Sequence, residues 1–430
     1  MKSPIIEAEY PITFRQQEAL ELGENIKLRH WVVLIGMKRV GISNFLRFFI
    51  NHKDVPRKYI SGSTSYLFIP VDLNDLIELG ISSFWTLTFK RIVDCLEGLD
   101  NKIKNSIEKL FSNAIRSQDP FMTIEGVRKS LVTMVEAGIM PTIFLIRFDR
   151  IKDFLTAEFF ANLQGLKEST HNKLCFVFTS YRSLDVLSPN IFAKSSLSAF
   201  SRNVYIKPAK KEDIKIIFNM YVRHSGINVS SKIEKELFDA VDGYVQYLQL
   251  ALVFLSEKKN HPFGNNNIFD GLVKDERIVL ASEELWDSLQ DREKDVLIKL
   301  VNSENLTNVE KEKAKYLWDM GFIKEENNKV KIFNPIFEYY IKHDEKKNLN
   351  NMVEFTKKEN LLFSFLKANN GAICDREKIV QNVWPEVESL GVSDWAIDRL
   401  VARARNKLKH QNSHYEIKTV KTRGYKLVET

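Results

Sequence analysis

The sequence has few cysteines, few turn-forming residues and no long hydrophobic run. Its three cysteines (Cys95, Cys175 and Cys374) include no CxxC pair, which excludes a disulfide framework and a zinc ribbon and predicts buried or half-buried thiols. Glycine and proline number only 17 and 11 among 430 residues, so collagen-like and low-complexity chains are excluded. No apolar run approaches the roughly 18 residues of a membrane span, and the start of the chain lacks a signal peptide's apolar core. We therefore expect a globular cytoplasmic protein with no membrane partner.

Positive charge is concentrated near the C-terminus. The chain carries 63 Lys and Arg against 56 Asp and Glu, which gives a net charge of +7. Residues 399–426 hold nine basic side chains and a single acid, Glu416. A local basic surface of this kind favours a polyanionic partner.

The first 207 residues alternate short apolar runs with helix-length amphipathic segments. Apolar strands separated by helices predict a parallel sheet in an α/β domain, and residues 208–279 read as a helical lid on that domain. The expected strands are 31–35, 65–71, 142–146 and 174–179. Polar breaks are expected at 96–117, 257–267 and 342–351.

Residues 280–345 have the order of elements of a winged-helix domain. Gly321 is expected to end the third helix, and a last helix should follow Pro335. Three helices followed by a hairpin predict a winged helix, with a generic helical subdomain as the alternative. The expected elements are helices at 283–289, 292–301 and 308–319, and a hairpin whose turn is 325–328.

A phosphate-binding loop is nearly complete after the first expected strand. Residues 36–43, Gly-Met-Lys-Arg-Val-Gly-Ile-Ser, follow the pattern G-x-x-x-x-G-K-[ST] except that Ile42 replaces the lysine. In such loops backbone N–H groups surround the phosphates, the lysine neutralises the β- and γ-phosphates, and the hydroxyl ligates Mg²⁺. The candidate nucleotide-binding residues are Gly36, Lys38, Arg39, Gly41, Ser43 and Asp149.

The second strand motif of such ATPases also lacks its acids. Ile146 and Arg147 stand where a magnesium-binding Asp and a catalytic Glu are expected. Asp149 is expected to start a turn or a helix rather than to bind metal. Because two catalytic elements are missing together, we predict no catalytic residue, no metal site and no required cofactor. ATP binding without hydrolysis, and retained ATPase activity, stay open as alternatives.

Residues 10–342 resemble the STAND signal-transduction ATPases of the AAA+ superfamily. The resemblance rests on segments 11–18, 36–49, 144–151, 176–181 and 243–251. It implies a P-loop NTPase fold and a nucleotide-dependent switch for oligomerisation. With Ile42 and Ile146 in the two motifs, it implies a pseudo-ATPase here.

A second three-helix unit with a hairpin is predicted at 352–430. Thr356 and Glu359 form a T-x-x-E capping box that starts the first helix, and the second is expected at about 375–384. Ser393 should cap a third helix, 394–409, with apolar residues on one side and cationic residues on the other. Strands at 415–420 and 424–428 would form a basic hairpin, and a helix beside a hairpin suits the major and minor grooves of DNA.

This segment, from Thr356 to Leu427, strongly resembles the OmpR/PhoB-type winged-helix DNA-binding domain of bacterial response regulators. The resemblance rests on 356–359, 375–385, 392–394, 403–408 and 417–425. It implies a recognition helix, a DNA-contacting wing, and a loop at 385–392 that can meet RNA polymerase. The expected DNA contacts are Trp395, Arg399, Arg403, Arg405, Asn406, Lys407, Lys409, Lys421, Thr422 and Arg423.

The sequence as a whole predicts a multidomain α/β protein with four parts. These are a degenerate P-loop domain (1–207), a helical lid (208–279), a winged-helix-like domain (280–345) and a winged helix-turn-helix (352–430). We expect a bacterial-type transcriptional regulator that binds double-stranded DNA, while RNA polymerase contact and self-association stay open. The alternatives are a nucleotide-dependent STAND-type switch ATPase, and a scaffold component whose winged helices contact other proteins.

Overall fold

The computed structural model describes residues 5–60, 65–192, 201–257, 267–326, 329–345, 355–384, 394–411, 413–420 and 423–429. The chain divides into two compact units. The first comprises Met1–Leu248 and Lys315–Ile323, and the second comprises Gln249–Ala314 and Lys324–Thr430. Within the described ranges no helix is both long enough and apolar enough to cross a bilayer.

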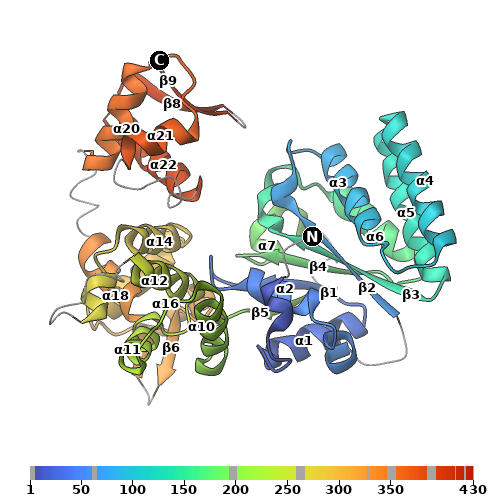
Figure 1. Ribbon diagram of the computed structural model, residues 1–430, viewed down its shortest axis with the longest axis horizontal. Helices are drawn as coiled ribbons and strands as arrows, with labels where there is room; N and C mark the ends of the chain where they lie inside the picture. The colour runs from blue at the N-terminus through green and yellow to red at the C-terminus, as the bar shows by residue number, and fades with distance from the viewer. Residues whose placement is uncertain are drawn as a thin grey trace. The chain divides into compact units, whose positions relative to one another are not determined.

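A five-stranded parallel sheet forms the centre of the first unit (Figure 1). Its strand order is β2-β3-β4-β1-β5. The four predicted strands and the parallel α/β architecture are confirmed, whereas β5 was not predicted, because only Val204 of its five residues is buried. The strands are β1 (Trp31–Ile35), β2 (Ser65–Asp72), β3 (Ile139–Ile146), β4 (Cys175–Ser180) and β5 (Ser201–Tyr205).

Helix α4 corrects one sequence prediction. The expected polar break at 96–117 is instead largely helix α4. Asp100 caps its first turn, because the backbone N–H of Lys102 donates a hydrogen bond to the Asp100 Oδ1 at 2.8 Å. Ile107 and Ala114 are buried, and α4 packs against α5, as Figure 1 shows. The helices of this unit before the lid are α1 (Gln16–Lys27), α2 (Ile42–Asn51), α3 (Ile81–Asp94), α4 (Asn101–Ser117), α5 (Pro120–Glu136), α6 (Ala157–Ser169), α7 (Leu184–Leu187) and α8 (Pro189–Phe192).

The segment after β5 is helical, as predicted. Gly243, at the turn between α11 and α12, has a φ of +80° and comes so close to Ala209 that an added Cβ would lie 2.1 Å from its carbonyl oxygen. The turn before α12 can therefore pack against the segment that precedes α10 only because this position is glycine. The helices are α10 (Lys211–Ser225), α11 (Ser231–Val241), α12 (Val245–Glu257) and α13 (Ile268–Leu272).

The predicted order of elements in residues 280–345 is confirmed, with one difference. The expected third helix is broken at Ala314 into α16 and α17, and Gly321 follows with a φ of +79°, as expected for a helix stop. The elements are α14 (Glu276–Asp287), α15 (Asp291–Val301), α16 (Asn308–Lys313), α17 (Lys315–Asp319), β6 (Ile323–Glu326), β7 (Lys329–Ile332) and α18 (Pro335–Tyr340).

The C-terminal module has three helices and an antiparallel hairpin. The predicted capping box is confirmed, since Thr356 and Glu359 bond to each other's backbone N–H groups. The apolar side of the third helix, from Ile397 to Leu408, is buried in the module's core, and Cys374 is buried there too. The predicted cap Ser393 and the loop 385–392 lie outside the described residues. The elements are α20 (Lys357–Ala368), α21 (Arg376–Val383), α22 (Asp394–His410), β8 (Tyr415–Val420) and β9 (Gly424–Glu429).

Candidate functional site

The phosphate-loop sequence folds as a strand, a loop and a helix. β1 ends at Ile35 and α2 begins at Ile42, directly after Gly41, whose φ is +108°. A Cβ on Gly41 would lie 2.8 Å from Cγ2 of Val245, so the loop and the first residue of α12 approach closely only because this position is glycine. The backbone therefore has the course that phosphate-binding loops have.

The apolar side chain of Ile42 occupies the position at which the motif has a lysine. Its Cδ1 lies 3.1 Å from the position that a Cβ would take on Gly36, and Cγ1 of Val40 lies 2.9 Å from the same point. Neither side chain offers a charge or a hydrogen-bond donor to a phosphate. The hydroxyl-bearing Ser43 is retained one residue further on, half-buried in the first turn of α2.

Arg15 and Tyr244 hold the loop from the protein side. The buried guanidinium of Arg15 donates to the carbonyl oxygens of Val40 (3.4 Å) and Lys207 (3.1 Å) and pairs with Glu18 at 3.0 Å. Burial lowers the pKa of Arg15, and the carboxylates of Glu18 and Asp213 oppose that shift. The Tyr244 hydroxyl donates to the Lys38 carbonyl at 2.6 Å. Arg15 therefore links one carbonyl of the loop, that of Val40, to the segment that follows β5.

Lys38 and Asp149, two of the predicted nucleotide-binding residues, lie in one neighbourhood. Lys38 Nζ is 5.6 Å from the ring centroid of Tyr181, a cation–π distance. Asp149 lies in the first turn of a 3₁₀ helix, Phe148–Phe154, which confirms its expected place at a helix start. Burial raises the pKa of Asp149, against the lowering effect of its own backbone N–H and of Lys38. Arg39 is exposed in the loop with a φ of +62°.

A cation stands where the catalytic acid was expected. Arg147 leaves β3 with a φ of +61°, and its backbone N–H donates to Oγ1 of Thr179 at 2.8 Å. Its guanidinium forms an ion pair with Asp72, the residue at the end of β2 that pairs in register with Ile146. The Asp72 carboxylate, which lies beside Ile146, is therefore engaged in an ion pair with Arg147. Over the described ranges, no three His, Cys, Asp or Glu side chains gather closely enough to hold a metal ion.

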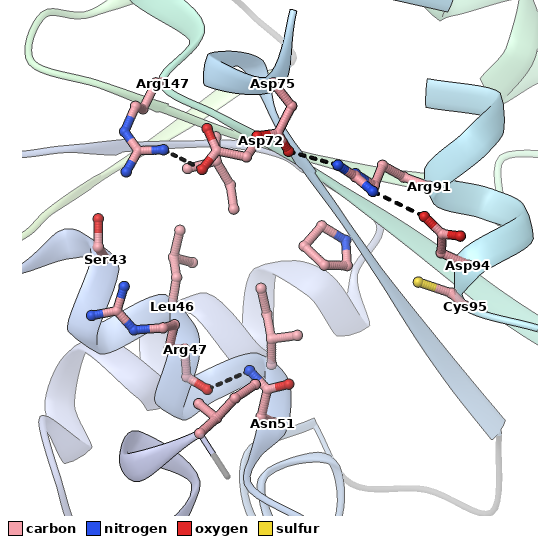
Figure 2. Close-up of a pocket in the computed structure, with 14 residues that line it drawn as sticks. Ser43, Leu46, Arg47, Asn51, Asp72, Asp75, Arg91, Asp94, Cys95 and Arg147 are labelled. Carbon is pink, nitrogen blue, oxygen red and sulfur yellow. Dashed lines mark hydrogen bonds and ion pairs between the residues drawn. The ribbon is translucent and has the colours of Figure 1, made fainter. Parts of the chain in front are cut away.

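A cavity of about 590 Å³ lies beside the loop, between α2, the ends of β2 and β3, and α3 (Figure 2). Apolar side chains such as Leu46 and Ile146 line it together with charged ones. Two of its ion pairs are Arg147 with Asp72, and Arg91 with Asp75 at 2.7 Å. The sequence motifs did not reveal this cavity, because α3 lies between the two motifs and matches neither of them.

Glu359 is the electrostatic centre of the C-terminal module. It is fully buried, and its Oε2 accepts hydrogen bonds from the Thr356 N–H and from Lys407 Nζ, each at 2.7 Å. Its Oε1 lies 2.9 Å from Nε of Arg403. Burial opposes ionisation of Glu359, but the hydrogen bonds from Lys407 and Thr356 and the charge of Arg403 outweigh it, so its pKa is lowered. Arg403 and Lys407 therefore fasten α22 to α20.

These contacts give three of the expected DNA-binding residues an internal role that sequence reasoning missed. Arg403 and Lys407 are only 18% and 14% exposed. Arg405 holds the wing, because its Nε donates to the Ile417 carbonyl and its Nη2 to Thr419 Oγ1, both at 2.7 Å. The capping-box glutamate was the available signal, since a buried acid must find cations. Their contact with DNA stays a prediction.

The other expected DNA-binding residues fall into three groups. Arg423 at the wing turn and Lys409 near the end of α22 are exposed. Arg399 is 16% exposed and pairs with acids of α14. Trp395 and Asn406 lie on α22, but the description does not extend to their side chains, and Lys421 and Thr422 lie outside the described residues.

The wing is attached to the segment that precedes α21. Cys374 and Tyr425 exchange backbone hydrogen bonds of 2.8 and 3.0 Å. Gly424 has a φ of +128°, and a Cβ there would lie 2.1 Å from the Cys374 carbonyl oxygen. The close approach of these two segments therefore requires glycine at this position.

Comparisons with known proteins agree with this description. Residues 350–427 match the family model described as transcriptional regulatory protein, C terminal. A search of curated proteins finds no match to the chain. Among solved structures, a Walker-type ATPase of Pyrococcus abyssi is 17% identical with a TM-score of 0.51, over 77% of this chain and 96% of that one. The ORC2 protein of Aeropyrum pernix is 10% identical with a TM-score of 0.47, over 81% and 99%.

The two comparisons concern different parts of the chain. The likeness to the Walker-type ATPase concerns the fold, and it agrees with the parallel sheet and the strand–loop–helix at 31–51. The family match covers the three helices and wing of the C-terminal module. The chain thus joins a parallel α/β fold like that of the Walker-type ATPase to a C-terminal segment that matches a transcriptional-regulator family model.

Proposed function

We propose that this protein is a cytoplasmic transcriptional regulator that binds double-stranded DNA through its C-terminal winged helix. Its ATPase-like region senses a ligand or partner, or assembles the protein, without hydrolysing ATP. The observation that carries the proposal is the family match over 350–427, in a segment that folds as three helices and a wing.

The exposed cations of the module support a contact with the DNA backbone. Arg423 lies at the turn of the wing and Lys409 in the last turn of α22, and both are exposed. Lys418 on β8 is about half exposed, and its pairing with Glu416, at 3.4 Å, is between two solvent-exposed side chains. Such cations bind phosphates, whereas Arg403 and Lys407 are engaged with Glu359.

Removing the two exposed cations should weaken binding to every duplex. We expect Arg423→Ala with Lys409→Ala to raise Kd roughly tenfold or more, and to reduce the log–log salt slope by about two, since two phosphate contacts are lost. The measurement is a fluorescence-anisotropy titration of the full chain with random and promoter-region duplexes at two salt concentrations.

A matched control tests whether the weaker binding depends on where the removed charges lie. Lys173→Ala with Lys235→Ala removes two exposed cations from the first unit and should leave Kd unchanged. Equal affinities for the wild type and the Arg423/Lys409 variant would contradict the proposed DNA-binding surface. Arg403→Ala does not serve this purpose, because it takes a partner from the buried Glu359 and so disturbs folding.

The inactive ATPase is supported by the chemistry at both motifs. Ile42 offers no charge to the β- and γ-phosphates, and Ile146 and Arg147 offer no carboxylate to Mg²⁺ or to an attacking water. Phosphoryl transfer depends on such positioned charges. We therefore infer that the loop has kept its shape and lost the groups that drive hydrolysis.

ATP should bind weakly and stay intact. We expect Mg²⁺–ATP to bind the full chain with a Kd weaker than about 1 mM, and no phosphate release, because the lysine and both acids are replaced. Calorimetric titration and a phosphate-release assay measure this, and DNA binding by the same sample serves as the folding control. A Kd for Mg²⁺–ATP well below 1 mM would contradict this expectation and would indicate that Lys38 or Arg39 replaces the missing lysine.

A nucleotide-dependent switch is the second candidate function. The retained strand–loop–helix and Ser43 favour it, as does the contact of the Tyr244 hydroxyl with the loop at Lys38. Duplex binding that occurs only with Mg²⁺–ATP would favour this switch over the inactive ATPase.

A further inference from the structure

Acidic residues of α14 hold the cationic face of the recognition helix. Glu283 lies with Oε1 3.3 Å from Nη2 of Arg399, and with Oε2 3.3 Å from Nη1 of Arg403. Asp287, one helical turn further on, forms an ion pair with Arg399. All of these residues belong to the second unit.

The contact is largely shielded from solvent and extends beyond α22. Arg399 and Glu283 are only 16% and 13% exposed. At the other end of α14, Glu276 accepts from Nζ of Lys358 on α20 at 2.6 Å. α14 thus presents three acids, at its start, middle and end, to cations of two helices of the winged helix.

The same cations cannot serve α14 and DNA together. Arg399 and Arg403 lie on the cationic side of the predicted recognition helix, and phosphate or base-edge acceptors would compete with the carboxylates for their N–H donors. The major groove, about 12 Å wide, admits one helix, so a second helix on this face would also block entry. The negative charge of Glu283 and Asp287 adds repulsion from the DNA backbone.

We propose that α14 is an autoinhibitory helix that covers the recognition helix α22, so that DNA binding requires its displacement. This inference rests on the proposed DNA-binding function. Release of these shielded ion pairs requires a ligand or partner that binds the uncovered form of the protein more tightly than the covered form. Glu283 and Asp287 keep the free protein in its low-affinity form.

Neutralising the two acids should increase DNA affinity. In the full chain, Glu283→Gln with Asp287→Asn should lower Kd for duplex about tenfold, because Arg399 loses both of its competing carboxylates and Arg403 keeps only its pair with Glu359. The control Glu304→Gln with Glu312→Gln removes the same charge from exposed positions of the same unit, and screening should limit its effect to less than about twofold. Equal shifts in the two variants would overturn the proposal.

A reversible cross-link tests the contact while Glu283, Asp287, Arg399 and Arg403 all stay in place. Cysteines at Glu284→Cys on α14 and Ala402→Cys on α22 should join through a cleavable bis-maleimide, while either single variant should give no such product. The cross-linked chain should lose duplex binding and regain it on cleavage. Absence of the cross-link, or unchanged binding by the linked chain, would refute the autoinhibition. If no form of the protein binds duplex, the proposed function fails, and the cross-link yield still decides the α14–α22 contact.

Discussion

Replacing Glu359 with alanine is expected to destabilise the C-terminal module by about 3 kcal/mol, because a fully buried carboxylate with cationic partners is removed. The change deletes one half of the capping box with Thr356, and it takes Glu359 away from Lys407 and from Arg403, which keeps only Glu283. Hydrogen exchange of the α20 and α22 amides in the full chain measures the loss. Glu377→Ala, an exposed glutamate on α21, is the matched control and should cost under about 0.5 kcal/mol.

The same glutamate predicts how the stability of this module depends on pH. The pKa of Glu359 is lowered from its ordinary 4.5, because its hydrogen bonds and nearby cations outweigh burial. A lowered folded-state pKa means that the contribution is complete above pH 4.5 and is lost as the pH falls through the folded value. The difference in stability between wild type and Glu359→Ala should therefore be constant near pH 7 and should shrink only in acid below pH 4.5. A difference that shrinks already between pH 7 and 5 would contradict this.

Replacing Gly243 with alanine should destabilise the first unit by about 3 kcal/mol or more, because backbone must move to admit the Cβ. The added Cβ would lie 2.1 Å from the Ala209 carbonyl oxygen, and the Ala209 N–H to Gly243 carbonyl bond of 2.9 Å would be disturbed. Tyr244, the next residue, would shift its contact with Lys38. Thermal unfolding and hydrogen exchange over residues 201–248 measure the loss.

Gly226→Ala separates the clash from the backbone conformation. Gly226 also has a positive φ, +65°, but a Cβ there would meet nothing within 4 Å. It should cost only about 1 kcal/mol, the penalty for a left-handed alanine. Similar losses in the two variants would mean that the approach of Gly243 to Ala209 is not tight.

Elements whose formation depends on residues close together in the sequence could be predicted. Strand β1, the capping box of α20 and the hairpin β8–β9 all follow from short local patterns. The two main departures are segments whose local composition misleads. Helix α4 is polar except for a narrow stripe that α5 covers, and β5 is held by its pairing with β1 rather than by apolar residues of its own.

The sequence by itself determined the classes of structure, because strand and helix periodicity, glycine positions and the replaced motif residues are properties of short segments. It also showed that Ile42, Ile146 and Arg147 stand where the motifs of such ATPases have a lysine and two acids. Only the tertiary structure decided which cations of α22 form ion pairs with acids of the same chain. Lys407 meets an acid 48 residues away and Arg399 one 112 residues away, and no local pattern reports contacts between segments so distant in the chain.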